Sequence, residues 1–115
     1  MYGELLALYY AERDSEAARD TALALALRDV GRRPTVESYD VLSWVRFRRQ
    51  ELDQALVASD SARRWGTPSP TMDWHRGRIL AALGRQAEAA PLLRSASEHP
   101  TMLAPHARRD LQASK

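Results

Sequence analysis

Stretches rich in Ala and Leu alternate along the chain with short polar breaks that contain Pro, Gly or Thr. Pro and Gly interrupt helices more strongly than other residues, so these breaks divide the chain into helical stretches. They fall at residues 32–35, 65–70 and 99–101. The stretches between them hold about 33, 31 and 29 residues. Because an average helix has about 11 to 12 residues, each stretch is too long for one helix.

Each long stretch also has a weaker polar break near its middle, at residues 12–15, 48–51 and 84–86. Three helix pairs are therefore predicted. Ser15 is a residue type favoured as an N-cap, and Gly84 suits the position after a helix that ends near Leu83. A short seventh helix is predicted over about residues 105–112, because Pro105 fits the first turn of a helix.

Small residues recur with a spacing of 34 between the second and third pairs. The shift brings Ser43 onto Gly77, Ala55 onto Ala89 and Ala62 onto Ala96, and Gly84 falls at the turn of the last pair. A helix-turn-helix unit of this length, with small residues at these positions, is the tetratricopeptide-repeat pattern, because its helices approach closely there. The predicted structural positions are Ser43, Ala55, Ala62, Gly77, Gly84, Ala89 and Ala96.

Four positions depart from that pattern. Ser59 stands where a large aromatic residue is usual, Arg46 and Arg76 stand at apolar positions, and Gln50 replaces the turn glycine. A guanidinium at an interior position must reach solvent or pair with a carboxylate. Asp40 and Asp73 are the candidate partners for these two arginines.

Several strings of the sequence are similar to the C-terminal repeats of a bacterial tetratricopeptide-repeat family. They lie at residues 34–44, 51–55, 74–79, 82–85 and 99–100, and residues 6–33 resemble a preceding repeat if a short gap is allowed. The resemblance implies one all-α domain over 1–115, a right-handed superhelix. Its helix pairs would span about 2–33, 35–66 and 70–100, followed by a capping helix at about 104–113. Members of such a family often form one end of a larger protein.

In such a superhelix the first helices of the pairs line a concave groove. The resemblance places in that groove Glu37, Asp40, Trp44, Phe47, Arg48, Thr71, Trp74, Arg78, Ala81 and Ala82. The candidate partner contacts among them are Asp40, Trp44, Phe47, Arg48, Trp74 and Arg78, since aromatic and Arg side chains dominate interface energies. The alternative is that Trp44, Phe47 and Trp74 pack against neighbouring helices.

The predicted last helix has one apolar face. Leu103, Ala107 and Leu111 recur every four residues and are expected to cover the last pair. Arg108, Arg109 and Asp110 are expected to face water.

Composition supports an all-α fold. The 115 residues include 19 Ala and 15 Leu, against five Val and one Ile, and this balance favours helix over strand. There is no Cys, which excludes disulfides, thiolate nucleophiles and cysteine-bound zinc. No apolar run approaches the roughly 18 residues of a membrane span, and no basic leader precedes an apolar segment, so we expect a cytoplasmic protein.

The net charge of the chain is only +2, although 16 of its 17 basic residues are Arg. A nucleic-acid surface would need clustered arginines, and the candidates are Arg46, Arg48, Arg49, Arg63 and Arg64. The first three point to different sides of a helix, and acidic residues lie between the groups. A solvated charged face is therefore favoured over a nucleic-acid surface.

The sequence offers little for catalysis. His75, His99 and His106 lie in separate segments without the spacing of a helical metal site. There is no phosphate-binding loop and no Gly-x-Ser-x-Gly string. We therefore predict no catalytic residue, metal or cofactor, and no enzyme activity.

The function predicted is a non-catalytic scaffold that binds a peptide or protein segment in the concave groove. The first alternative is a structural module that self-associates or belongs to a larger protein. The second is a helical repeat that contacts nucleic acid through its arginines.

Overall fold

The computed structural model describes the backbone of residues 2–64 and 66–114, and the side chains of residues 4–64 and 66–114. Met1, Trp65 and Lys115 lie outside the described residues. Trp65 is the first residue of the predicted 65–70 break, so that position of the break is not described either. The described residues form seven α-helices, so the chain is all-α as predicted. They divide into two compact units, Met1–Gly66 and Thr67–Lys115. The single-domain organisation stays a prediction.

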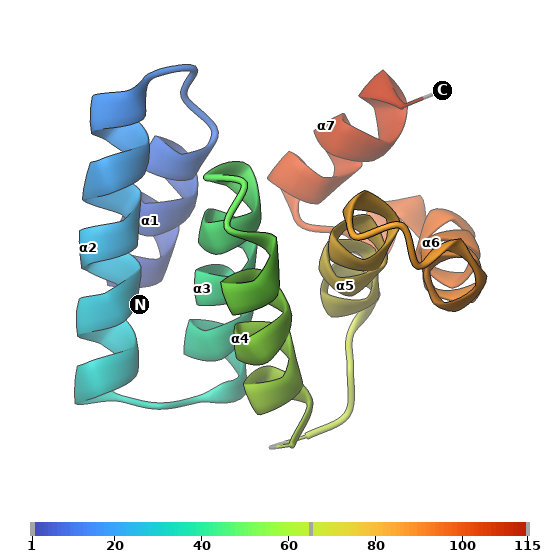
Figure 1. Ribbon diagram of the computed structural model, residues 1–115, viewed down its shortest axis with the longest axis horizontal. Helices are drawn as coiled ribbons and strands as arrows, with labels where there is room; N and C mark the ends of the chain where they lie inside the picture. Colours follow the sequence, from blue (N-terminus) through green and yellow to red (C-terminus); the bar gives the residue numbers. More distant parts are fainter. Residues whose placement is uncertain (1, 65, 115) are drawn as a thin grey trace. The chain divides into compact units, whose positions relative to one another are not determined.

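The first unit consists of two helical hairpins (Figure 1). Its helices are α1 (Tyr2–Ala11), α2 (Glu16–Arg32), α3 (Val36–Arg48) and α4 (Leu52–Arg64). Helix α1 packs on α2, and α3 packs on α4. Helix α3 also contacts α1 and α2, so it lies at the centre of the unit.

The second unit contains one hairpin and a short final helix (Figure 1). Its elements are α5 (Pro70–Ala82), α6 (Gln86–Ser97), a 3-10 turn at Pro100–Met102 and α7 (Pro105–Ala113). Helices α5 and α6 pack on each other, and α7 contacts α5. The predicted seventh helix is confirmed, whereas the 3-10 turn before it was not predicted.

Hydroxyl side chains begin three of the helices. Ser15 accepts a hydrogen bond from the backbone of α2 and is the N-cap that the sequence predicts. Thr35 caps α3 by accepting a hydrogen bond from the Ser38 amide, and the Ser38 hydroxyl accepts one from the Thr35 amide in return, so the two residues form a capping box. Ser69 caps α5 directly before Pro70, which occupies the first helical position.

The turns of the α3/α4 and α5/α6 hairpins are alike. Helices α3 and α5 begin and end 34 residues apart, and α4 and α6 begin 34 residues apart. Gln50 and Gly84 both have left-handed backbone, with φ of 63° and 81°. The amides of Glu51 and Arg85 each donate to a carbonyl five residues earlier, at 2.9 Å. Gly84 therefore ends α5 as predicted, while Gln50 adopts a conformation that favours glycine.

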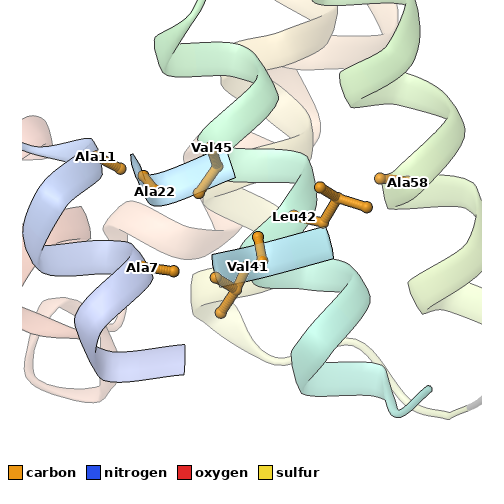
Figure 2. Packing of buried hydrophobic residues seen from close by; sticks show 8 residues of the cluster. Ala7, Ala11, Ala22, Val41, Leu42, Val45 and Ala58 are labelled. Carbon is orange, nitrogen blue, oxygen red and sulfur yellow. The ribbon is translucent and has the colours of Figure 1, made fainter. Parts of the chain in front are cut away.

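Small side chains form much of the core of the first unit (Figure 2). Its buried residues are Ala7, Ala11, Ala22, Ala26, Val41, Leu42, Val45 and Ala58. Alanines at the α1/α2 contact leave little side-chain volume between the two helix backbones, so these helices can approach closely.

The predicted small positions are buried within the hairpins, apart from the turn residue Gly84. They are Ser43, Ala55, Ala62, Gly77, Ala89 and Ala96. At Gly77 the approach is closest, because an added Cβ would lie only 2.6 Å from Leu93 Cδ2 of α6. Helices α5 and α6 therefore approach closely at Gly77, while the role of these positions in a repeat stays a prediction.

The apolar face of α7 packs as predicted. Leu103, Ala107 and Leu111 are buried in one cluster with Trp74 and Ala96. In the part of the chain that the structure describes, no helix combines the length and apolar character that a membrane crossing needs.

Candidate functional site

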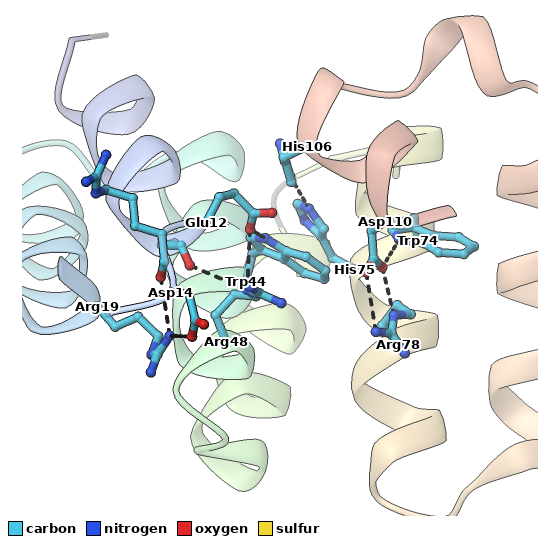
Figure 3. A network of polar contacts seen from close by, with 12 residues as sticks. Glu12, Asp14, Arg19, Trp44, Arg48, Trp74, His75, Arg78, His106 and Asp110 are labelled. Carbon is cyan, nitrogen blue, oxygen red and sulfur yellow. Dashed lines mark hydrogen bonds and ion pairs between the residues drawn. The ribbon is translucent and has the colours of Figure 1, made fainter. Parts of the chain in front are cut away.

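Trp44, the central aromatic residue of the predicted groove, is buried in the first unit. Its ring stacks on Phe47, with centroids 4.9 Å apart and planes at 25°. The indole Nε1 donates a hydrogen bond of 2.8 Å to Glu12 Oε2, just beyond the end of α1 (Figure 3). Trp44 has no exposed surface. Its observed role is therefore to attach α3 to the end of α1.

Arg48, one turn after Trp44 on α3, approaches the same carboxylate. Its Nε lies 3.5 Å from Glu12 Oε2 and donates weakly to the Ala11 carbonyl at 3.4 Å. Both side chains of this ion pair are partly exposed, so the pair contributes little energy by itself. The Glu12 carboxylate therefore contacts two side chains of α3, the indole of Trp44 and the guanidinium of Arg48.

Trp74 and Arg78 form the corresponding arrangement in the second unit (Figure 3). Trp74 Nε1 donates to Asp110 Oδ2 of α7 at 2.8 Å. Arg78 Nε lies 2.8 Å from the same oxygen, and its Nη2 reaches Oδ1 at 3.4 Å. The Asp110 side chain is only 15% exposed. The prediction that Asp110 faces water is therefore wrong: two donors on α5 draw its carboxylate inward.

The two arrangements share a sequence string. Residues 44–48 and 74–78 both read Trp-x-Arg-x-Arg, and in each the Trp and the last Arg stand four residues apart on one helix face. Each Trp–Arg pair contacts a single carboxylate outside its own helix: Glu12, just after α1, in the first unit, and Asp110 of α7 in the second. The string recurs with a spacing of 30 rather than 34, so the alignment of small residues did not reveal it. A search for repeated tryptophan strings would have found it.

Both tryptophans are buried, which contradicts the exposure that the groove prediction gave them. Trp44 is 0% exposed and Trp74 is 3% exposed. The packing alternative is the one observed for these two rings. Asp40, Phe47, Arg48 and Arg78 are half-buried and retain some accessible surface.

Arg46 and Arg49 share one acidic residue at the α3/α4 turn. Arg46 Nη1 donates to Glu51 Oε1 at 3.0 Å, and Arg49 Nε donates to the same oxygen at 3.2 Å. Arg49 also binds Asp20 of α2. The predicted partners of Arg46 were Asp40 or Asp73, whereas the carboxylate it binds is that of Glu51, because the turn returns Glu51 to the end of α3.

These contacts shift two pKa values. Hydrogen bonds to Asp20 and then to Glu51 raise the pKa of Arg49. Partial burial acts to raise the pKa of Glu51, but the hydrogen bonds from Arg46 and Arg49 outweigh it and lower that pKa. Arg46 and Arg49 are thus engaged within the unit, which weakens their case as phosphate contacts.

A polar hollow of about 460 Å³ lies beside this turn in the first unit. It is lined by Asp14, Glu16, Arg19, Asp20, Arg48, Arg49 and Gln50. Three acidic and three basic side chains face it, so its formal charges cancel. An open, charge-balanced hollow of this kind favours neither an anion nor a cation.

Two of the three histidines meet inside the second unit, although the sequence places them in separate segments. His75 Nε2 of α5 and His106 Nε2 of α7 lie 2.8 Å apart, and both residues are buried. His99 is exposed. The signal that could have found the pair is that each histidine lies beside an apolar position of its helix.

The described side chains form no cluster of three or more His, Asp or Glu residues that would hold a metal ion. Comparisons of the chain with protein families, with curated proteins and with solved structures give no match.

Proposed function

We propose that the chain is a tetratricopeptide-like helical array. Three hairpins and a final helix would form a right-handed superhelix, with repeats over about 2–33, 35–66 and 70–100. Support comes from the matched bounds and turns of the α3/α4 and α5/α6 hairpins at a spacing of 34. The burial of small residues at equivalent positions supports it further.

We propose that this array acts as a non-catalytic scaffold for a peptide or protein segment. The observation that carries the proposal is the rigid attachment of the first helices: buried indoles fix α3 and α5 through Glu12 and Asp110. A surface that is already ordered loses little conformational entropy when a partner binds. The partner contacts would come from the half-buried groove candidates Asp40, Phe47, Arg48 and Arg78, rather than from the tryptophans.

A peptide display selection on the purified chain, followed by calorimetry, tests this function. We expect selected peptides to bind at least tenfold more weakly to Phe47→Ala and Arg48→Ala. Arg94→Ala, on the exposed face of α6, is the matched control and should bind like the parent chain. If no peptide is selected, or if the three variants bind alike, the proposed groove function is wrong.

Self-association is a second candidate, favoured by apolar side chains on the outer face of α1. Leu5 is 61% exposed and Tyr9 is 57% exposed, while Ala7 and Ala11 face the core. A helix that is apolar on both sides normally buries both. Sedimentation velocity over a range of concentrations tests this function, and a Leu5→Glu variant should shift any dimer towards monomer. A single monomer species at all concentrations would exclude it.

A further inference from the structure

The polar hollow of the first unit has no part in the functions proposed above, apart from its residue Arg48. Its volume of about 460 Å³ lies within the range of roughly 300 to 1,000 Å³ that is typical of small-molecule sites. Its walls come from the turn after α1, the first turns of α2, and the end of α3 with the turn that follows. All of these segments belong to one compact unit, so the hollow does not depend on the second unit.

Four of the six charged side chains that line the hollow pair with one another. Arg49 Nη1 donates to Asp20 Oδ1, and the Nε and Nη2 atoms of Arg49 donate to Glu51. Arg19 Nη1 lies 3.7 Å from Asp14 Oδ1. The formal charges of these four lining residues cancel. The other two charged side chains therefore decide which ligand the hollow favours.

Those two side chains, Arg48 and Glu16, keep hydrogen-bonding groups that the protein does not use. The Nε atom of Arg48 faces Glu12 and the Ala11 carbonyl (Figure 3). Among the described residues, Arg48 Nη1 and Nη2 make no hydrogen bond, and the Glu16 carboxylate has neither a hydrogen bond nor an ion pair. Arg48 and Glu16 therefore do not pair with each other, and they form two separate poles of opposite charge.

Gln50 adds an uncharged amide to the hollow from a strained position. Its backbone is left-handed, and Gly84 takes the same conformation at the equivalent turn without a side chain. Left-handed residues other than glycine are uncommon, because their Cβ crowds the neighbouring carbonyl, and they concentrate at binding and active sites. Within the described chain the Gln50 side chain makes no hydrogen bond. The strained turn therefore points to a ligand that uses this amide.

The two poles distinguish between classes of ligand. An anion at Arg48 is repelled by Glu16, and a cation at Glu16 is repelled by Arg48, so a ligand with one charge gains little. A ligand that carries both charges can satisfy both poles. The Nη1 and Nη2 atoms of Arg48 form a fork that donates two parallel hydrogen bonds to a carboxylate, and an ammonium group donates to Glu16.

We propose that the hollow is a binding site for a small zwitterion, a molecule that carries one carboxylate and one ammonium group. Free amino acids belong to this class. Arg48 binds the carboxylate, Glu16 accepts hydrogen bonds from the ammonium group, and the Gln50 amide donates to the carboxylate. Glu16 and Gln50 are exposed and Arg48 is half-buried, so each contact is weak and the expected affinity is millimolar.

NMR titration of the intact chain with a series of amino acids tests the site. Free glycine, β-alanine and γ-aminobutyrate carry the same two charges at increasing separation, whereas acetate and methylammonium carry one charge each. We expect at least one of the three zwitterions to shift the side-chain signals of Gln50 and Arg48 in a saturable way. It should bind at least about threefold more tightly than either single-charge ion. No peptide is present, so the result does not depend on the scaffold function.

Four variants locate the bound zwitterion. Arg48→Gln and Glu16→Gln should each weaken binding about threefold to fivefold. Gln50→Gly should also weaken binding although it relieves backbone strain, so a loss of stability cannot explain its effect. Asp53→Asn, at an exposed position of α4 outside the hollow, is the control and should bind like the parent chain.

The site is wrong if none of the three zwitterions shifts the signals of the hollow, or if acetate or methylammonium binds as tightly as they do. It is also wrong if Arg48→Gln and Glu16→Gln both bind like the parent chain, or if Asp53→Asn loses as much affinity as they do.

Discussion

Gln50 and Gly84 occupy the same left-handed backbone conformation at equivalent turns, 34 residues apart. Gly84 adopts it without a side chain, whereas the Cβ of Gln50 comes too close to the neighbouring carbonyl. The hydrogen bonds of the two turns are alike, including the 2.9 Å bonds from the amides of Glu51 and Arg85. The α3/α4 turn therefore stores backbone strain that the α5/α6 turn does not.

Gln50→Gly should stabilise the first unit. Relief of left-handed strain is worth about 1 kcal/mol, and the greater freedom of glycine in the unfolded chain offsets part of this. We expect a net gain of about 0.5 kcal/mol in the free energy of unfolding, measured by urea denaturation. The side chain of Gln50 is exposed, so its loss removes little packing.

A pair of glycine substitutions provides the control for this prediction. A Cβ added at Gly31 or at Gly84 meets no atom within 4 Å, so space does not distinguish the two sites. Gly31→Ala lies within α2 and should stabilise by about 0.5 to 1 kcal/mol, whereas Gly84→Ala should destabilise by about 1 kcal/mol. If the free energy of unfolding changes in the same direction in both variants, backbone conformation does not determine the effect of the substitution.

Gly77→Ala should destabilise the α5/α6 hairpin. The new Cβ would lie 2.6 Å from Leu93 Cδ2 and 3.3 Å from the Leu93 backbone nitrogen, so the helices must separate or the Leu93 side chain must move. We expect a loss of about 1 to 3 kcal/mol. A double-mutant cycle with Leu93→Ala measures the coupling, and Gly77→Ala should cost at least about 1 kcal/mol less in that background. Equal costs in both backgrounds would show that the contact is not responsible.

Ala89→Leu should also destabilise α6, because Ala89 is fully buried. Three extra carbon atoms in a packed helix contact cost about 1 to 3 kcal/mol. Ala90→Leu places the same side chain at the next, exposed position of the helix and should change the free energy of unfolding by less than about 0.5 kcal/mol. Equal melting temperatures for the two variants would contradict the packing assigned to Ala89.

The sequence predicts the helices of this chain well because their signals are local. Ser15, Pro105 and Gly84 act on the helix ends within a few residues, so each could be located without knowing what the helix packs against. The small residues Ala55 and Ala89 could also be located from the sequence, because close packing of a hairpin imposes a fixed spacing on its two adjacent helices.

The polar contacts could not be predicted because they join helices that are distant in sequence. Trp44 and Glu12 are 32 residues apart, and Trp74 and Asp110 are 36 apart. Spacing along one helix indicates that a Trp and an Arg share a face, but not which carboxylate reaches that face. For the same reason the sequence left open whether these two rings are exposed or packed, and it concealed the contact of His75 with His106.

Asp110→Ala should destabilise the second unit more than its position on a short final helix would indicate. The substitution removes the acceptor of Trp74 Nε1, a buried donor, and the partner of Arg78, which is about one third exposed. We expect a loss of about 2 kcal/mol, and a smaller loss for Asp110→Asn, which keeps an acceptor oxygen. Asp14→Ala is the control: its side chain is fully exposed, and the substitution should cost less than about 0.5 kcal/mol. Equal effects of the two alanine variants in thermal unfolding would contradict the anchoring role of Asp110.

Glu51→Gln should reduce stability at neutral pH but not in acid. Partial burial of Glu51 opposes its charge, yet hydrogen bonds from Arg46 and Arg49 lower its pKa below the ordinary value of 4.5. The unfolded chain therefore binds this proton more readily than the folded chain, so the stabilisation is present above pH 4.5 and is lost as the pH falls through the lowered pKa. We expect the variant to be about 1 kcal/mol less stable than the parent at pH 7 and nearly equal to it at pH 2.5, by urea denaturation. Glu98→Gln, at the exposed end of α6, should follow the parent at both values. If the free energy of unfolding of Glu51→Gln stays below that of the parent by the same amount from pH 7 to pH 2.5, the loss comes from packing and not from the two arginine contacts.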